Sequence, residues 1–483
     1  MPSTAIALGV AQAVLQWFDT SFQCQKKIPL AEWTVLAGIV VSSPPTTTCS
    51  GDTFRVLAAA TGNKCLGRCD LNAEGLVVND CHAEVLARRA FLRYLYVEAL
   101  IWQQNGQRSS EHSFFALHPI SRRLVLKPHY SLHLFISEAP CGDAAIYELR
   151  ESVVNEMVQQ REAREIGQLD QRYRNKFRLT GAKAQKNRLK EAQFQADIDT
   201  LLDSKSAQAV GRARIKSGRS DLPLEKQTLS MSCSDKVAKW NALGLQGSLL
   251  LQWFEPVFLT SVVIIEDDRA MSIERQNMAL YRAVCSRLIE RSALVEGTQL
   301  ICETSVVSVN PQFSRRRNFY FDRPSSCLAV NWTTQEPHWT QAGEIRLPTD
   351  ALKVACRAMD AARFLHIFFN DFDLEFLMAA SGFKQGAKKT SKMDIIAMEK
   401  VASRLAKRNL LRAFYHVQCQ NFNLNSTFCL KYLRLKQMKK ASVSPAKLST
   451  STAFTSDIAR RKQFFGAFND WVGVPATFKQ FTL

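Results

Sequence analysis

The run Cys-His-Ala-Glu at residues 81–84 lies between a turn-like segment, residues 78–80, and an apolar stretch with helical spacing, residues 85–92. The run therefore places a histidine and a glutamate, two residues apart, at the start of a helix. Imidazole is a common zinc ligand, and a carboxylate near a metal can carry protons without binding the metal. The pair is common by chance, so it gains weight only when further ligands follow it.

Further ligands do follow, at Pro140-Cys141 and the Gly-Asp-Ala that comes next. In the signature of zinc deaminases, a His-x-Glu precedes a Pro-Cys-x-x-Cys that supplies two cysteines. Here Ala144 occupies the position of the second cysteine. A third protein ligand must therefore come from elsewhere, or the site is inactive. Cys81 is a poor candidate because adjacent residues of a helix point apart.

Other cysteines are open as the third ligand, and their spacing in the sequence does not choose among them. The candidates are Cys233, Cys285, Cys302 and Cys327.

The overall charge is strongly basic, with 63 Lys plus Arg against 44 Asp plus Glu and a net charge of +19. This excess predicts a polyanionic partner, with nucleic acid as the first choice, although a protein that is simply basic is the alternative. The 13 cysteines are scattered, and no apolar run reaches the roughly 18 residues of a membrane span. Residues 5–15 resemble a short amphipathic helix and not a secretory leader. We therefore expect an intracellular protein, nuclear or cytoplasmic, without a membrane segment or a disulfide-linked partner.

Strands and helices alternate early in the chain. Apolar runs at residues 35–41, 54–60, 124–127 and 131–136 predict strands, and the pattern over residues 82–103 predicts a helix. This order predicts an α/β layered core.

The later part of the chain is expected to be more helical, and we expect one domain over residues 1–483. A charged segment at about 148–208 has the composition of a solvated helical insertion. A Ser/Thr/Ala-rich segment at about 442–456 has that of a loop insertion. Helices are expected over residues 351–369, 391–416 and 456–468.

Three motifs, at residues 79–84, 140–144 and 230–236, together resemble the RNA adenosine deaminase family. The resemblance covers roughly residues 35–145 and 205–483. It implies a three-layer cytidine-deaminase-like core, a mixed sheet flanked by helices, with a helical C-terminal extension. It also implies a zinc ion on His82, Cys141 and Cys233, with Glu84 moving protons while adenosine is hydrolysed to inosine.

Basic residues follow the first motif on the same helix and recur on later helices. A buried cation needs an anion, although salt bridges or solvated side chains are the ordinary explanation. The family resemblance implies a buried inositol hexakisphosphate as a structural cofactor. The positions that match its cluster are Arg88, Arg89, Lys236, Lys239, Trp240, Ser248 and Lys407, with Lys431 and Arg461 near the expected places at the C-terminal end.

The resemblance also indicates where RNA would bind. Asn63 and Lys64 match the edge of the base pocket, and Arg219 lies in a basic loop similar to the family's substrate-facing loop. No double-stranded-RNA-binding module is expected before the deaminase pattern, and residues 385–390 and 461–466 look like the tRNA-specific members. The implied substrate is tRNA, at an adenosine next to the anticodon of tRNA-Ala. The alternatives are an editor of structured or double-stranded RNA and an inactive RNA-binding protein of this fold.

Overall fold

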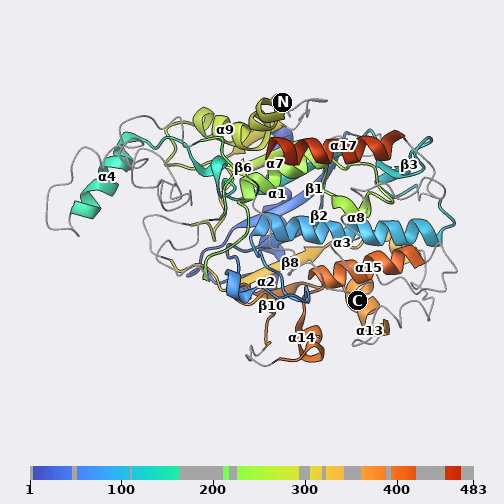
Figure 1. Cartoon of the computed structure of the whole chain (residues 1–483). Coiled ribbons are helices and arrows are strands. Elements are labelled where there is room, and N and C mark those ends of the chain that lie inside the picture. Colours follow the sequence, from blue (N-terminus) through green and yellow to red (C-terminus); the bar gives the residue numbers. More distant parts are fainter. Residues whose placement is uncertain are drawn as a thin grey trace.

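A mixed sheet forms the centre of the computed structural model, which describes residues 4–45, 52–108, 111–162, 210–216, 226–292, 305–317, 323–341, 361–387, 393–419, 452–468 and 471 (Figure 1). Its strand order is β10-β9-β8-β2-β1-β5-β6-β7. The central strand β1 pairs antiparallel with β2 and β5, whereas β5, β6 and β7 are parallel to one another. The strand bounds are β1 (Leu36–Ser43), β2 (Thr53–Thr61), β5 (Ser131–Ile136), β6 (Ser261–Ile265), β7 (Ser305–Val309), β8 (Leu328–Thr333), β9 (Glu375–Met378) and β10 (Phe383–Lys384), with a separate hairpin of β3 (Phe115–Leu117) and β4 (Leu124–Leu126).

Helices cover both faces of this sheet. Their bounds are α1 (Thr4–Thr20), α2 (Phe22–Lys27), α3 (Ala83–Gln104), α4 (Glu151–Glu162), α7 (Cys233–Leu243), α8 (Gly247–Leu250), α9 (Ile273–Tyr281), α10 (Arg287–Ser292), α11 (Pro337–Gln341), α13 (Ala361–Leu365), α14 (Ile395–Val401), α15 (Lys407–Cys419) and α17 (Thr452–Ala467). Single turns also occur at η1 (Arg68–Asp70) and η2 (Asp143–Ala145), and wider π-type turns at η6 (Arg282–Ser286) and η7 (His366–Asn370). In Figure 1, α3 crosses the view between α17 and α15. No described helix is long and apolar enough to cross a membrane.

The layers follow from the alternation of side chains along β1. Ile39 belongs to the core cluster that contains α3, whereas Val40 belongs to the cluster that contains α1. Residues 36–42 of β1 are all buried, as expected for a strand covered on both faces. Gly38 faces α1, and a Cβ at this position would come within 2.6 Å of the side chain of Val14. The prediction of a mixed sheet flanked by helices is therefore confirmed.

Several expected elements need correction or lie outside the described residues. The helix expected over residues 391–416 is two helices, α14 and α15, because Ala402 is extended and pairs with Phe383. The Glu375 carboxylate then accepts hydrogen bonds from the next two residues, Ser403 and Arg404. These contacts interrupt the helix, although the sequence pattern continues through the break.

The predicted end of the loop at about 442–456 is also wrong, because α17 already begins at Thr452. Serine and threonine cost only a few tenths of a kcal/mol more than alanine in a helix, so a following helix can extend through them. Within the insertion expected at 148–208, α4 is helical, and residues 163–209 lie outside the described residues. Of the helix expected over 351–369, the part before Ala361 also lies outside them.

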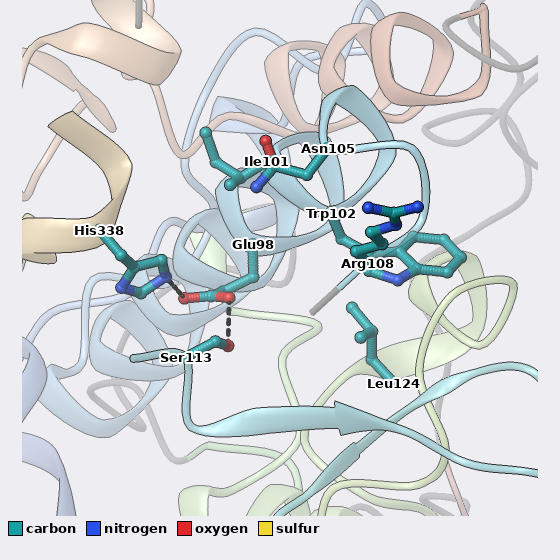
Figure 2. A pocket seen from close by; sticks show the side chains of 8 residues that line it. All are labelled: Glu98, Ile101, Trp102, Asn105, Arg108, Ser113, Leu124 and His338. Atoms are coloured by element: carbon teal, nitrogen blue, oxygen red, sulfur yellow. Dashed lines mark hydrogen bonds and ion pairs between the residues drawn. The ribbon is translucent and has the colours of Figure 1, made fainter. Parts of the chain in front are cut away.

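A small cavity lies beside the C-terminal half of α3, at Glu98 (Figure 2). Its volume of about 10 Å³ matches a single water molecule, so it is not a substrate pocket. The Glu98 carboxylate is 3% exposed. It accepts hydrogen bonds from four buried donors, which are the hydroxyls of Tyr94 (3.1 Å) and Ser113 (2.8 Å), His338 Nε2 (3.1 Å) and Trp339 Nε1 (3.0 Å).

Replacing Glu98 with leucine is expected to lower the free energy of unfolding by about 3–5 kcal/mol, because the buried donors lose the acceptor that they share. Urea denaturation of wild type, Glu98→Leu and Glu98→Gln measures this. Glutamine keeps an acceptor oxygen, so its loss should be clearly smaller. Equal stability of the leucine variant and wild type would contradict this role of Glu98.

Candidate metal centre and active site

His82 is positioned by the junction between β2 and α3. It is the N-cap residue of α3, and the residues on both sides of it are tied to the end of β2. The backbone N–H of Ala83 donates to the Gly62 carbonyl (2.9 Å), and that of Cys81 donates to the Lys64 carbonyl (2.9 Å). Gly62 has a φ of 144°, and a Cβ there would collide with the carbonyl of Cys81. Glycine is therefore required for this close approach.

Cys141 and Cys233 come from two segments that are bound to each other. Cys141 follows β5, and Cys233 begins α7 after Ser232, whose hydroxyl caps the helix by accepting from the Asp235 N–H. The Cys233 N–H donates to Cys141 Sγ (3.4 Å). Gly142 has a φ of 107°, and a Cβ there would overlap the Ser232 side chain. A glycine after Cys141 thus lets the start of α7 reach the first cysteine.

The three predicted ligands converge. Within the described residues, the one group of His, Cys, Asp or Glu side chains close enough to share a metal is His82, Cys141 and Cys233, whose ligand atoms all lie within 4.8 Å of one another. His82 Nδ1 lies 3.5 Å from Cys233 Sγ and 4.0 Å from Cys141 Sγ. A tetrahedral zinc site places its sulfur and nitrogen ligands about 3.6 Å apart. The donor set and its spacing therefore fit a zinc ion with one position left open.

The electrostatics of the two thiols also suit a cation. The hydrogen bond with Cys233 lowers the pKa of Cys141 well below its usual range, whereas burial raises the pKa of Cys233. A metal between the sulfurs would favour both thiolates, because only deprotonated sulfur ligates well. By contrast, Cys81 packs in the apolar core, where burial raises the pKa of its thiol. Cys81 therefore has a structural role.

Glu84 lies in the first turn of α3, two residues after His82, and its side chain is 3% exposed. Its Oε2 atom is buried and has no hydrogen-bond partner among the described residues. A buried carboxylate oxygen without a partner is costly unless something else binds there. The N-terminus of α3 favours negative charge at this position. The site therefore offers a proton acceptor beside the candidate metal ligands.

Next to the candidate metal ligands lies a buried ion-pair network centred on Asp80, to which sequence reasoning assigned no role. Asp80 Oδ1 accepts from the His82 N–H (3.1 Å) and Lys216 Nζ (2.9 Å), and Oδ2 accepts from Ser230 Oγ (2.9 Å) and Lys236 Nζ. Burial alone would raise the pKa of Asp80, but the two ammonium groups hold it well below its usual range. The only signal in the sequence was the position of Asp80 inside the first motif.

A family model described as the adenosine-deaminase (editase) domain matches residues 58–346, more than half of the chain. The chain belongs to this family. The tRNA-specific adenosine deaminase 1 of Drosophila melanogaster is 34% identical over 269 residues, which are 55% of this chain and 57% of that protein. The tRNA-specific adenosine deaminase 1 of Macaca fascicularis is 30% identical over 352 residues, 56% of this chain and 67% of that protein.

The double-stranded RNA-specific adenosine deaminase of Mus musculus is similar too, with 32% identity over 230 residues, 48% of this chain and 17% of that protein. The chain thus spans a little over half of the fly protein and about a sixth of the mouse protein.

In this editase domain, the basic residues assigned to a polyphosphate fall into two neighbourhoods. In the first, the guanidinium of Arg88 lies 5.2 Å from the Trp240 ring centroid. A Cβ at Gly247 would come within 3.1 Å of Arg88 Nη2, and the adjacent Ser248 hydroxyl is buried without a hydrogen-bond partner among the described residues. Arg89 donates to the carbonyl of Leu405 (2.6 Å), just before Lys407 begins α15.

The second neighbourhood surrounds Phe465 of α17. Lys239 Nζ lies 4.8 Å from the ring centroids of both Phe465 and Trp471, and the Arg461 guanidinium lies 5.6 Å from that of Phe465. Lys236 is paired with Asp80. Lys431 lies outside the described residues. In the first neighbourhood, the unpartnered hydroxyl of Ser248 near the partly buried Arg88 is compatible with a phosphate ligand.

Two of the predicted RNA-contacting residues of the editase domain are described. Asn63 donates from Nδ2 to the Trp33 carbonyl (3.3 Å), and its buried Oδ1 has no partner among the described residues. Lys64 Nζ contacts the Ser325 carbonyl (3.4 Å) and Cys327 Sγ (3.3 Å). Both residues lie on the segment that is hydrogen-bonded around His82. Arg219 lies outside the described residues.

Proposed function

We propose that this protein is a zinc-dependent hydrolase that converts adenosine to inosine in tRNA, next to the anticodon of tRNA-Ala. The observation that carries the proposal is the convergence of His82, Cys141 and Cys233 beside the unpartnered carboxylate oxygen of Glu84. The family membership supports the reaction. If the protein were an inactive RNA-binding protein of this fold, the buried carboxylate would have no explanation.

The three metal ligands and Glu84 have different roles in the proposed reaction. Zinc held by His82, Cys141 and Cys233 would supply a Lewis acid that lowers the pKa of water toward neutrality. Glu84 Oε2 accepts a proton from the water that attacks C6 of adenine, and the carboxyl group delivers it to N1. Glu84 then passes the second proton of the water to the leaving amino group. Water and adenosine become inosine and ammonia, and Glu84 ends as it began.

The choice of tRNA rests on the relatives and on the charge. Two of the similar proteins are tRNA-specific by name, and the net charge of +19 suits a polyanion. The second candidate is an editor of double-stranded RNA, because the mouse relative is of that kind. We further propose a single domain over residues 1–483 that acts inside the cell, in the nucleus or the cytoplasm.

An assay with two substrates separates these candidates. Purified protein is incubated with the anticodon stem-loop of tRNA-Ala and with a long RNA duplex, and inosine is measured by mass spectrometry. The proposal expects inosine in the stem-loop and much less in the duplex. Inosine in the duplex alone would contradict the tRNA assignment, and no inosine in either would contradict the deaminase assignment.

We also propose inositol hexakisphosphate as a buried structural cofactor. Arg88, Trp240 and Ser248 would hold it on one side, and Arg89, Lys239, Lys407 and Arg461 would add positive charge around it. A ligand that binds only the folded state stabilises that state. Native and acid-denatured protein are compared by mass spectrometry. Release of no polyphosphate on denaturation would overturn this part of the proposal.

A further inference from the structure

Trp33 lies just before β1, and its backbone is fixed from several sides. Its N–H donates to the Pro324 carbonyl (2.9 Å), and its own carbonyl accepts from the Ser326 N–H (2.8 Å) and from Asn63 Nδ2 (3.3 Å). The indole itself is only partly buried. A large aromatic ring is thus held at the surface on a rigid backbone.

The side chain of Arg317 covers this ring. Its guanidinium carbon lies 5.4 Å from the centroid of the Trp33 ring, within the range of a cation–π contact. Arg317 is exposed, and its backbone N–H donates to Glu138 Oε1 (3.2 Å). The partly buried indole and the exposed guanidinium therefore form an aromatic, positively charged pair at the surface.

Both halves of the pair are hydrogen-bonded to segments that lead to the candidate metal ligands. On one side, the Trp33 carbonyl accepts a hydrogen bond from Asn63. Asn63 lies between Gly62 and Lys64, whose carbonyls accept from the backbone N–H groups of the residues on either side of His82. On the other side, Arg317 is bonded to Glu138, three residues before Cys141. The Trp33–Arg317 pair therefore lies at the rim of the candidate active site.

A target base that leaves its strand loses stacking with its neighbours, which must then find new partners. Single-stranded RNA is bound by aromatic rings and arginine planes on which bases stack, and by nearby cations that attract phosphates. Lys64, on the segment around His82, adds such a cation on the Asn63 side of the pair. A pair that only stabilised the fold would not need exposure at this rim.

We propose that the Trp33–Arg317 pair is a stacking platform for the nucleotide that directly flanks the target adenosine. The inference rests on the proposed RNA deaminase function and adds a substrate subsite to it. The platform holds the flanking base by stacking, which is tolerant of base identity, and Arg317 supplies charge next to its phosphate. The platform positions the substrate and takes no part in proton transfer.

The test compares a tRNA-Ala anticodon stem-loop with versions that carry an abasic residue on the 5′ or the 3′ side of the target adenosine. In wild type, one abasic version should raise KM about 5- to 150-fold, the range expected for one lost stacked base. Trp33→Ala should raise KM for the intact RNA to a similar extent with little change in kcat. In that variant the abasic residue should have no further effect, because the two changes remove the same contact.

Three further variants keep the test decisive. Trp33→Phe retains a ring and should restore most of the affinity, and Arg317→Gln tests the guanidinium without altering the indole. Trp17→Ala is the matched control, because Trp17 is also partly exposed but packs at a tilt against the ring of Trp332. It should leave the dependence on the flanking nucleotide unchanged.

The outcomes separate the two proposals. Wild type that forms inosine with equal KM on all three RNAs overturns the platform and leaves the deaminase function standing. Penalties of Trp33→Ala and the abasic residue that multiply, instead of overlapping, also overturn it. A wild-type protein that forms no inosine overturns the proposed function and the platform together.

Discussion

Replacing Glu84 with glutamine is expected to lower inosine formation by about 10²–10⁴-fold, the usual contribution of a general acid–base residue. Glutamine has almost the same shape but cannot accept or release the proton. Because Glu84 is not one of the three convergent ligand side chains, the metal content of the variant should equal that of wild type. Inosine is measured by mass spectrometry of tRNA, and bound metal by elemental analysis.

The same helix offers a matched control in Glu98→Gln. Both glutamates are 3% exposed and both lie on α3, but Glu98 is bonded to Ser113 and His338 and not to the metal cluster. Glu98→Gln should reduce stability and keep the activity of the folded protein. Comparable activity losses in the two variants would contradict a specific role for Glu84. Loss of metal from Glu84→Gln would instead indicate that Glu84 supports the metal site.

Replacing Asp80 with alanine is expected to lower the free energy of unfolding by about 3–5 kcal/mol, because it leaves two cations without their partner in a buried site. Lys216 is 7% exposed and Lys236 is partly buried, and both donate to the Asp80 carboxylate. The variant also removes the acceptor of the His82 N–H. We therefore expect weaker metal retention as well as lower stability, measured by urea denaturation and by competition with a chelator.

Glu148→Ala is the control for this variant, because Glu148 forms an exposed ion pair with Arg275 (3.6 Å). Exposed pairs contribute about 0–1 kcal/mol, so the stability of the control should be close to that of wild type.

The low pKa of Asp80 also predicts that the stability of the protein depends on pH. The stability that Asp80 contributes is present above the unfolded-state pKa of about 3.9 and is lost as the pH falls below it. An Asp80→Ala protein as stable as wild type would contradict the role of the network.

Much of the fold could be predicted because the signals were local. The apolar runs of β1, β2 and β5 and the helical spacing of α3 each specify one element, and these elements lie close to the predicted positions. The predictions of secondary structure were wrong where contacts between distant segments determine the backbone conformation. The continuous helical pattern through residues 402–406 is interrupted because the Glu375 carboxylate takes the backbone and hydroxyl donors there. No local sequence pattern predicts such an acceptor.

The sequence by itself predicted a zinc-dependent deamination, because His82, Glu84 and Cys141 sit in two short motifs that resemble those of zinc deaminases. Spacing along the chain did not choose among the remaining cysteines, since it says nothing about separation in space, and Cys233 was predicted from the family resemblance alone. The tertiary structure placed Cys233 at the cluster, through the cap of α7 by Ser232 and the space left by Gly142. It also decided the role of Asp80, because an ion-pair partner is selected by packing between segments that lie more than a hundred residues apart.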